Sequence, residues 1–299
     1  MEKTLILGAT GKIASLTADL LYQASPECLR VATSREAGLD GLRSRYPGVN
    51  VVRADWNERS SLVAAMKGVS RVLVVTPGFV TDESLVTPNI IAAAKAVGSI
   101  ELLLRLVAMP PGCVVDDLTP EYLATRVGAA QHVIARPLLE ASGLPVCYVN
   151  VPAWFMLNLP WFLATEVKAK RRIDLPAATD ASRMWVSEFD IAAVMAKILT
   201  EPASRHVGHE YMLTSADRST YADIARMFSE HLGAPVVYND DDKTMRALFG
   251  KYFDTLMTYM ISEGNMYTSV PHLETVAEML GRPQQTLSDY IAAHLQDYK

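Results

Sequence analysis

The N-terminal segment MEKTLILGATGKIA places two glycines and an alanine directly after an apolar run. Gly8, Gly11 and Ala14 have the spacing G-x-x-G-x-x-A, between a predicted strand at 4–8 and a predicted helix. Residues without bulk allow a close approach of the backbone to a pyrophosphate, and the N–H groups at the helix start then face the phosphates. Because the strand and the helix are both present, the motif favours dinucleotide binding over a simple tight turn.

The end of the second predicted strand indicates which dinucleotide is bound. A site for NAD usually has an acidic residue there for the ribose hydroxyls. This chain has Thr33, Ser34 and Arg35, and a guanidinium with hydroxyl neighbours suits the 2′-phosphate of NADP. Lys12 in the glycine turn adds a second cation, whereas Glu36 argues for NAD. The pattern favours NADP(H), with solvated surface charge as the alternative.

Two further predicted strands end at the same edge of the sheet. Asp55 follows the third strand, where its carboxylate could accept a hydrogen bond from an adenine amino group or cap a helix starting near Glu58. Thr76 and Pro77 follow the fourth strand. Since ligands bind at the carboxyl ends of parallel strands, we expect Thr76 and Pro77 beside the ribose and nicotinamide.

The elements that must position these residues alternate along the chain. Apolar runs without polar alternation occur at 4–8, 29–33, 49–53, 71–75, 101–107 and 145–151, and helix-like segments lie between them. This order is typical of an α/β fold with a doubly wound parallel sheet of the Rossmann type. We expect a dinucleotide-binding domain over 1–152, with a returning segment near 184–207, and a smaller, mostly helical substrate domain over 153–299.

Within the second half, two local features carry predictions. Asp190 is well placed to cap the apolar helix in MWVSEFDIAAVMAKILT, and residues 242–264 are expected to be helical. Met257, Tyr259 and Met260 on that segment would line the substrate pocket or a dimer surface.

Composition excludes several classes of function. A formal net charge of −5 argues against a nucleic-acid partner, and no run of apolar residues is long enough for a membrane helix. With a strand starting by residue 4, we expect no signal peptide. The three scattered cysteines, Cys28, Cys113 and Cys147, indicate a reducing cytoplasm. The histidines show no metal-ligand spacing, so we expect no metal.

Taken together, these motifs resemble the NmrA-like family of atypical short-chain dehydrogenases, which includes quinone and dye reductases and redox-sensing regulators. The resemblance extends over nearly the whole chain and is carried by GATGKIA, TSR, VRADWNERSSLVAAMKGVSRVLVVTP, HVIARPLLEASGLP, AWFMLNL, SEFDIAAVMAKIL and HEYMLTS. It implies a Rossmann domain with NADP(H) in its crevice and a C-terminal substrate domain. The residues expected at the cofactor are Gly8, Thr10, Gly11, Lys12, Ile13, Arg35, Asp55, Thr76 and Pro77. Trp154, Phe155 and Asn158 would lie over the nicotinamide and substrate.

The chain departs from the family where catalytic groups are expected. Val107 or Ala108 stands where members often have serine. Tyr122 is followed at the Tyr-x-x-x-Lys spacing by Arg126, which hardly deprotonates. His132 occupies the histidine of an H-x-x-x-E pattern whose glutamate is replaced by arginine. His132 is the best candidate proton donor and Tyr122 a weaker one, with a structural role as the alternative for each.

The aromatic cluster after residue 153, which includes Trp154 and Phe155, is either core between the domains or an apolar wall for a flat substrate. We therefore expect an NADPH-dependent reductase of a quinone, dye, imine or enone, acting by direct hydride transfer. A non-catalytic NADP(H) redox sensor and a Rossmann-derived isomerase or cyclase are the alternatives. The expected partner is a small apolar substrate, and the sequence leaves open whether the protein forms a homodimer.

Overall fold

A seven-stranded parallel sheet forms the centre of the molecule, in a computed structural model that describes residues 3–299. Its strand order is β10-β6-β5-β4-β1-β2-β3. The strands are β1 (Thr4–Leu7), β2 (Leu29–Thr33), β3 (Asn50–Arg53), β4 (Arg71–Val74), β5 (Leu102–Val107), β6 (Val146–Asn150) and β10 (Glu210–Met212). The order in which strands are added to the sheet reverses between the parallel neighbours β1 and β4, which is where open α/β sheets bind ligands. The predicted doubly wound sheet is confirmed.

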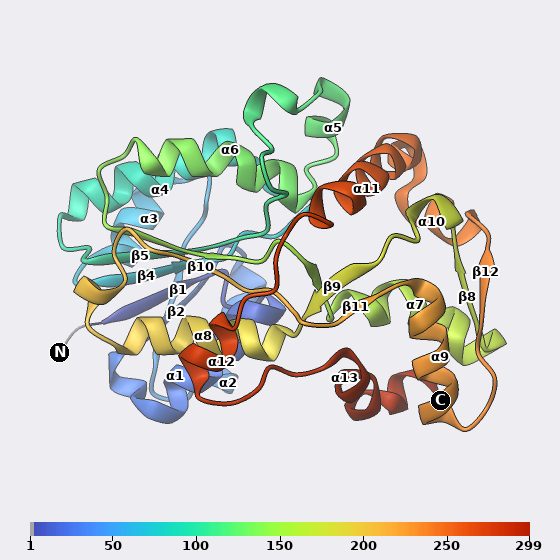
Figure 1. Ribbon diagram of the computed structural model, residues 1–299. Helices are drawn as coiled ribbons and strands as arrows, with labels where there is room; N and C mark the ends of the chain where they lie inside the picture. The colour runs from blue at the N-terminus through green and yellow to red at the C-terminus, as the bar shows by residue number, and fades with distance from the viewer. Residues whose placement is uncertain (1–2) are drawn as a thin grey trace.

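Helices cover both faces of this sheet (Figure 1). One face carries α3 (Arg59–Met66), α4 (Glu83–Val97) and α6 (Gly128–Glu140), and the other carries α1 (Lys12–Ala24), α2 (Leu39–Arg45) and α8 (Glu188–Thr200). Strands buried on both sides explain the unbroken apolar runs, because residues that alternate along β5 enter different cores. Leu104 and Leu106 pack on the α1 side, while Leu103 and Val107 pack on the α4 side.

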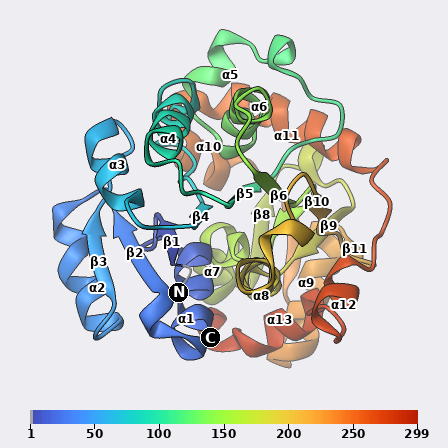
Figure 2. The ribbon, with the colours of Figure 1, turned by 90° about the vertical axis from the view of Figure 1, so that its left-hand side faces the viewer.

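Most of the remaining chain forms a cap beyond the carboxyl ends of the strands (Figure 1). It holds a three-stranded sheet of β7 (Trp154–Phe155), β9 (Arg183–Val186) and β11 (Arg218–Ser219), and a pair of β8 (Arg172–Leu175) and β12 (Val237–Asp240). Its helices are α7 (Asn158–Lys170), α9 (Tyr221–Leu232), α10 (Lys243–Phe249), α11 (Phe253–Tyr267) and α13 (Leu287–Ala293). Helix α12 (Thr275–Leu280) instead packs beside α8 on one face of the main sheet. Figure 2 shows α8 passing beside α1, so the chain returns to the main sheet between cap segments.

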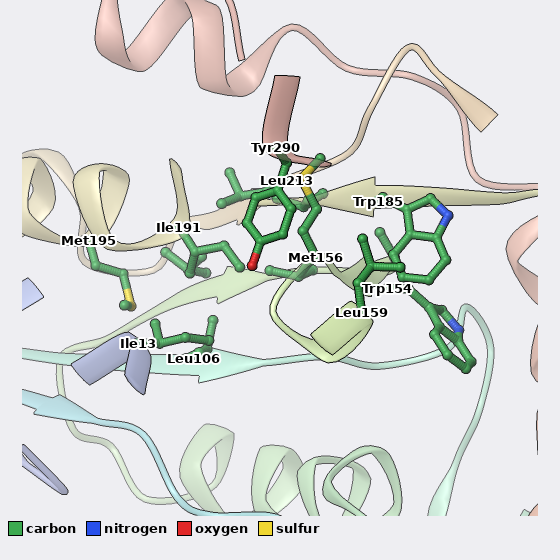
Figure 3. Close-up of a cluster of buried hydrophobic side chains, with 14 of the residues drawn as sticks. Ile13, Leu106, Trp154, Met156, Leu159, Trp185, Ile191, Met195, Leu213 and Tyr290 are labelled. Carbon is green, nitrogen blue, oxygen red and sulfur yellow. The ribbon is translucent and has the colours of Figure 1, made fainter. Parts of the chain in front are cut away.

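One apolar core runs from the main sheet into the cap. Ile13 and Leu106 lie at one end of the cluster in Figure 3, and Trp154 and Trp185 lie at the other. The two indole rings meet edge to face, with centroids 5.5 Å apart. Because apolar side chains from both parts are buried in one cluster, the cap has a fixed place over the strand ends.

Three sequence predictions differ from the structure in detail. Ser187, not Asp190, caps α8: its hydroxyl accepts from the Phe189 N–H at 3.2 Å. The Asp190 carboxylate instead binds the Gln285 N–H and the Arg282 guanidinium, each at 2.8 Å. The segment 242–264 is two helices, because Gly250, at φ 51°, ends α10 before α11 begins. The main sheet also takes a strand, β10, from beyond the expected returning segment.

Within residues 3–299, no helix is long and apolar enough to cross a membrane. The same residues contain no group of three or more His, Cys, Asp or Glu side chains placed to hold a metal ion.

Candidate functional site

The glycine turn after β1 forms a cradle with no room for side chains. Gly8 has φ 77°, and a Cβ there would lie 2.7 Å from the Val75 carbonyl oxygen and 3.3 Å from the Trp56 ring. Gly11 is the N-cap of α1 and gives that helix no side-chain cap. The first N–H groups of α1 are thus available to an anion, which fits the pyrophosphate of a dinucleotide.

Gly8→Ala is expected to weaken NADPH binding at least tenfold and to lower the free energy of unfolding by about 1–3 kcal/mol, since the left-handed backbone and the Val75 carbonyl both oppose a methyl group. Gly41→Ala is the matched control, because a Cβ at Gly41 in α2 meets nothing within 4 Å. The control should bind NADPH like the parent and be up to about 1 kcal/mol more stable. Fluorescence titration and urea denaturation measure both effects; equal binding by the two variants would contradict the cradle.

The cradle opens into a cavity of about 820 Å³ that extends from the strand ends to the cap. Its size lies within the ~300–1,000 Å³ range of small-molecule sites. The predicted residues on its wall are Gly8, Thr10, Gly11, Lys12, Ile13, Arg35, Thr76, Pro77, His132, Trp154, Phe155 and Asn158. Asp55, expected at the cofactor, and Tyr122, expected as a proton donor, do not line this wall.

The polar end of the cavity is built by the ends of β2 and β3. Ser34 and Arg35 line it, together with Lys12 from the glycine turn. The Asp55 carboxylate turns away: it accepts from the Asn57 N–H at 3.0 Å and from Arg53 at 2.8 Å. It does not cap α3 either, whose N-cap is Glu58. Trp56 and Asn57 line the cavity in its place.

Behind Thr76 lies a fully buried ion pair that the sequence analysis missed. Arg105 on β5 donates to Glu83 Oε1 at 2.5 Å and to Thr76 Oγ1 at 2.8 Å, and the Thr76 hydroxyl donates to the same Glu83 oxygen at 2.5 Å. Burial favours the neutral form of Glu83, but the Arg105 charge and the hydroxyls of Thr76 and Thr87 hold its pKa below the ordinary value. The pair fixes the Thr76 side chain at the cavity wall. The signal available in the sequence was a charged residue, Arg105, inside the apolar strand LLLRLV.

His132 on α6 faces the cavity as a neutral imidazole. Its Nδ1 lies 2.9 Å from the Ala108 N–H and 3.4 Å from the Ala108 carbonyl oxygen. The shorter contact requires Nδ1 to accept, which assigns the proton to Nε2. Burial and the nearby Arg105 lower the pKa of His132 to about 4. The ring can therefore donate a hydrogen bond to a bound molecule but is not an imidazolium at neutral pH. Arg136, at the family's glutamate position, pairs with Glu210 and Glu140 instead.

The lowered pKa of His132 makes folding stability depend on pH. The ordinary pKa of an unfolded histidine is about 6.5, so between pH 6.5 and 4 the unfolded chain binds more protons than the folded one. Neutral His132 therefore contributes about 3 kcal/mol to the free energy of unfolding above pH 6.5, and this contribution is lost as the pH falls to about 4. In urea denaturation at several pH values, His132→Asn should show a correspondingly smaller loss on acidification. An equal loss of stability on acidification in parent and variant would contradict this role of His132.

Tyr122 on α5 (Pro120–Ala124) lies outside the cavity wall because it packs behind α11. Its ring stacks on Tyr259, with centroids 4.5 Å apart, and only 7% of the residue is exposed. Burial raises the pKa of its hydroxyl well above the ordinary value. Of these two tyrosines, Tyr259 is the one that lines the cavity. Met260 lines it too, whereas Met257 is buried in the core.

The cap end of the cavity is an aromatic wall. Trp154 contacts Phe162 at 5.8 Å between centroids, and Phe162 contacts Trp161 at 4.6 Å. At the opening, Trp161 meets Phe79 edge to face at 6.1 Å, and both are about half exposed (49% and 45%). Trp154 also belongs to the core, so both interpretations of this cluster apply to it. Such a wall suits a flat apolar molecule.

Comparisons with known proteins agree with this architecture. The chain is 28% identical, over 298 residues and 97% of each chain, to an NAD(P)H azoreductase from Xenophilus azovorans. Among solved structures, an NADPH-dependent quinone oxidoreductase from Escherichia coli complexed with NADPH matches with a TM-score of 0.76 at 22% identity, covering 98% of this chain and 99% of that chain. A triphenylmethane reductase from Citrobacter sp. complexed with NADP(H) matches with a TM-score of 0.76 at 18% identity, covering 97% and 99%. Both structural likenesses concern the fold. The family description "NmrA-like family" matches residues 1–290, and the chain therefore belongs to the NmrA-like family.

Proposed function

We propose that this protein is an NADPH-dependent reductase of a flat, apolar acceptor. The observation that carries the proposal is the single cavity that joins the glycine cradle to the aromatic wall of the cap. One end offers cations and helix N–H groups, and the other offers rings, so a dinucleotide and an acceptor fit end to end. The names of the azoreductase and quinone oxidoreductase relatives support the same reaction class.

Each part of the wall has a proposed role toward NADPH, which supplies a hydride when bound. Gly8, Thr10, Gly11 and Ile13 hold the pyrophosphate, and Lys12 adds charge beside it. Arg35, with Ser34, binds the 2′-phosphate. Thr76 and Pro77 pack against the ribose and nicotinamide. These residues line one cavity, which supports the assignment.

The other residues act on the acceptor. Phe155 and Trp154 exclude water and orient a planar molecule, and Asn158 fixes its polar edge. The Nε2–H of His132 donates a hydrogen bond to the heteroatom on which negative charge develops, as a neutral donor that stays protonated. Quinones, azo or triarylmethane dyes, imines and enones all have the required shape.

The two alternatives predict different observations. A redox sensor would bind oxidised and reduced cofactor with different affinities and would not turn over, and an isomerase would consume no NADPH. The aromatic wall, which shares one cavity with Thr76 and His132, favours a bound acceptor, and hence a reductase, over a sensor.

The test follows absorbance of NADPH with a naphthoquinone, an azo dye and a triarylmethane dye, in the absence of oxygen. The proposal expects stoichiometric NADPH oxidation with at least one of them, faster than with NADH. Binding of NADPH without oxidation by any acceptor would contradict it. Size-exclusion chromatography with light scattering would establish whether the active form is a homodimer.

A further inference from the structure

A carboxyl group lies in the aromatic wall of the cavity. Glu263, on α11, lines the cavity but is only 7% exposed. Its Oε2 accepts from the Trp154 indole N–H at 3.3 Å, and Trp154 also faces the cavity. Helix α11 runs along the cap side of the site, near α5 (Figure 1). A buried carboxyl among rings is costly to ionise, and active-site acids are kept protonated in this way.

Glu263 is buried beside aromatic rings and near the cation of Arg183. The titratable groups around it are Arg183 on β9, Tyr259 and Tyr267 on α11, Tyr122 on α5 and Tyr221 on α9. Burial raises the pKa of Glu263, and Arg183, the Tyr hydroxyls and Trp154 only partly oppose this rise. Arg183 is held by backbone carbonyls, donating to Ala181 at 3.0 Å and to Met260 at 3.3 Å. Its charge is therefore fixed near the carboxyl and is available to stabilise a carboxylate.

The reaction of a neutral acceptor needs a proton that the other candidates supply poorly. Reduction of a quinone to a hydroquinone takes one hydride and one proton. His132 is neutral, and loss of its Nε2 proton would leave an imidazolate. Tyr122 is off the cavity wall. Burial raises the pKa of Tyr259 and Tyr267, the two tyrosines on the wall, well above the ordinary value, which makes both weak acids. Lys12 and Arg35 lie at the opposite, polar end.

We propose that Glu263 is the general acid of the cavity, donating its carboxyl proton to the reduced acceptor. This inference rests on the proposed reductase function. As a quinone takes up the hydride, its electron pair moves to the oxygen, the O–H bond of Glu263 breaks and the proton goes to that oxygen. Glu263 is left as a carboxylate facing Arg183, and solvent returns the proton before the next turnover. The balance is quinone, NADPH and one proton giving hydroquinone and NADP⁺.

The test compares two kinds of acceptor in the parent and in Glu263→Gln. A neutral naphthoquinone needs a proton, whereas a cationic triarylmethane dye takes up a hydride to give a neutral product without one. The variant should lose about 10²-fold or more of its naphthoquinone rate and keep its NADPH affinity and its dye rate. Glu263→Asp, which retains an acid, should recover part of the naphthoquinone rate. The rate in the parent should fall at alkaline pH as the acid ionises, and this fall should be absent in Glu263→Gln.

An infrared difference spectrum of parent minus Glu263→Gln reports the acid without turnover. A protonated carboxyl band at neutral pH is expected, and a carboxylate band in its place would overturn the inference. If Glu263→Gln lost its activity toward naphthoquinone and toward the dye equally, Glu263 would have a structural role, and the inference would be overturned too. If the parent turns over no acceptor, the proposed function fails and takes this inference with it; if the parent turns over naphthoquinone and the variant does so equally, only the inference fails.

Discussion

Glu83→Gln is expected to lower the free energy of unfolding by about 3–5 kcal/mol, because it leaves the Arg105 charge unpaired inside the protein. Glu83 and Arg105 are 0% and 1% exposed, and Arg105 Nε and Nη1 already have no hydrogen-bond partner among the described residues. The amide could still accept from Thr87, so the loss reports charge rather than hydrogen bonding. Urea denaturation at neutral pH measures it as a lower midpoint with an unchanged slope.

A second variant separates the unpaired charge from a general loss of packing. Arg105→Met combined with Glu83→Gln removes both charges and should recover most of the stability, since buried ion pairs are often replaceable by apolar residues. Because the folded pKa of Glu83 is depressed, the contribution of the pair is present at neutral pH and is lost as the pH falls below the ordinary carboxyl range. A single Glu83→Gln variant as stable as the parent would show that the pair does not hold this region together.

Arg35→Ala is expected to weaken NADPH binding about 10- to 100-fold while changing NADH binding little, because hydrogen bonds to a charged group contribute about 1.5–3 kcal/mol. Arg35 lines the cavity beside Ser34, at the carboxyl end of β2. Its backbone is fixed by a hydrogen bond of 3.3 Å from its N–H to the Thr33 hydroxyl. Titration of NADPH and NADH against parent and variant measures the effect.

Arg43→Ala is the matched control for charge. Arg43 lies on α2, close in sequence to Arg35, and its exposed side chain pairs with Asp40 at 2.8 Å. Removing it changes the net charge equally without touching the cavity wall. Equal losses of NADPH and NADH affinity in Arg35→Ala would show that the 2′-phosphate is bound elsewhere.

The fold could be predicted from sequence because its signals are local. The unbroken apolar runs reflect strands buried on both faces, and the helix predicted after the glycine turn is present as α1. The glycine turn was equally readable, since the close approach of Val75 to Gly8 requires a missing side chain.

The chemistry of the site could be predicted less well from the sequence, because it depends on contacts between distant segments. Tyr122 has catalytic spacing, but the stacking of Tyr259 on it decides which ring reaches the cavity. Asp55 sits at the expected strand end, yet Arg53 two residues earlier takes its carboxylate. Glu263 was invisible as a candidate acid because a glutamate on a helix is ordinarily solvated, and only the packing of α11 against Trp154 buries it.

The most direct test of the central claim is a side-by-side titration of the purified protein with NADPH, NADP⁺, NADH and NAD⁺. We predict saturable binding of NADPH and NADP⁺ with similar affinities, each at least about tenfold tighter than the corresponding NADH or NAD⁺. Strong preference for one oxidation state would favour a sensor. Binding of none of the four would contradict the account, because the glycine cradle would then be only a turn.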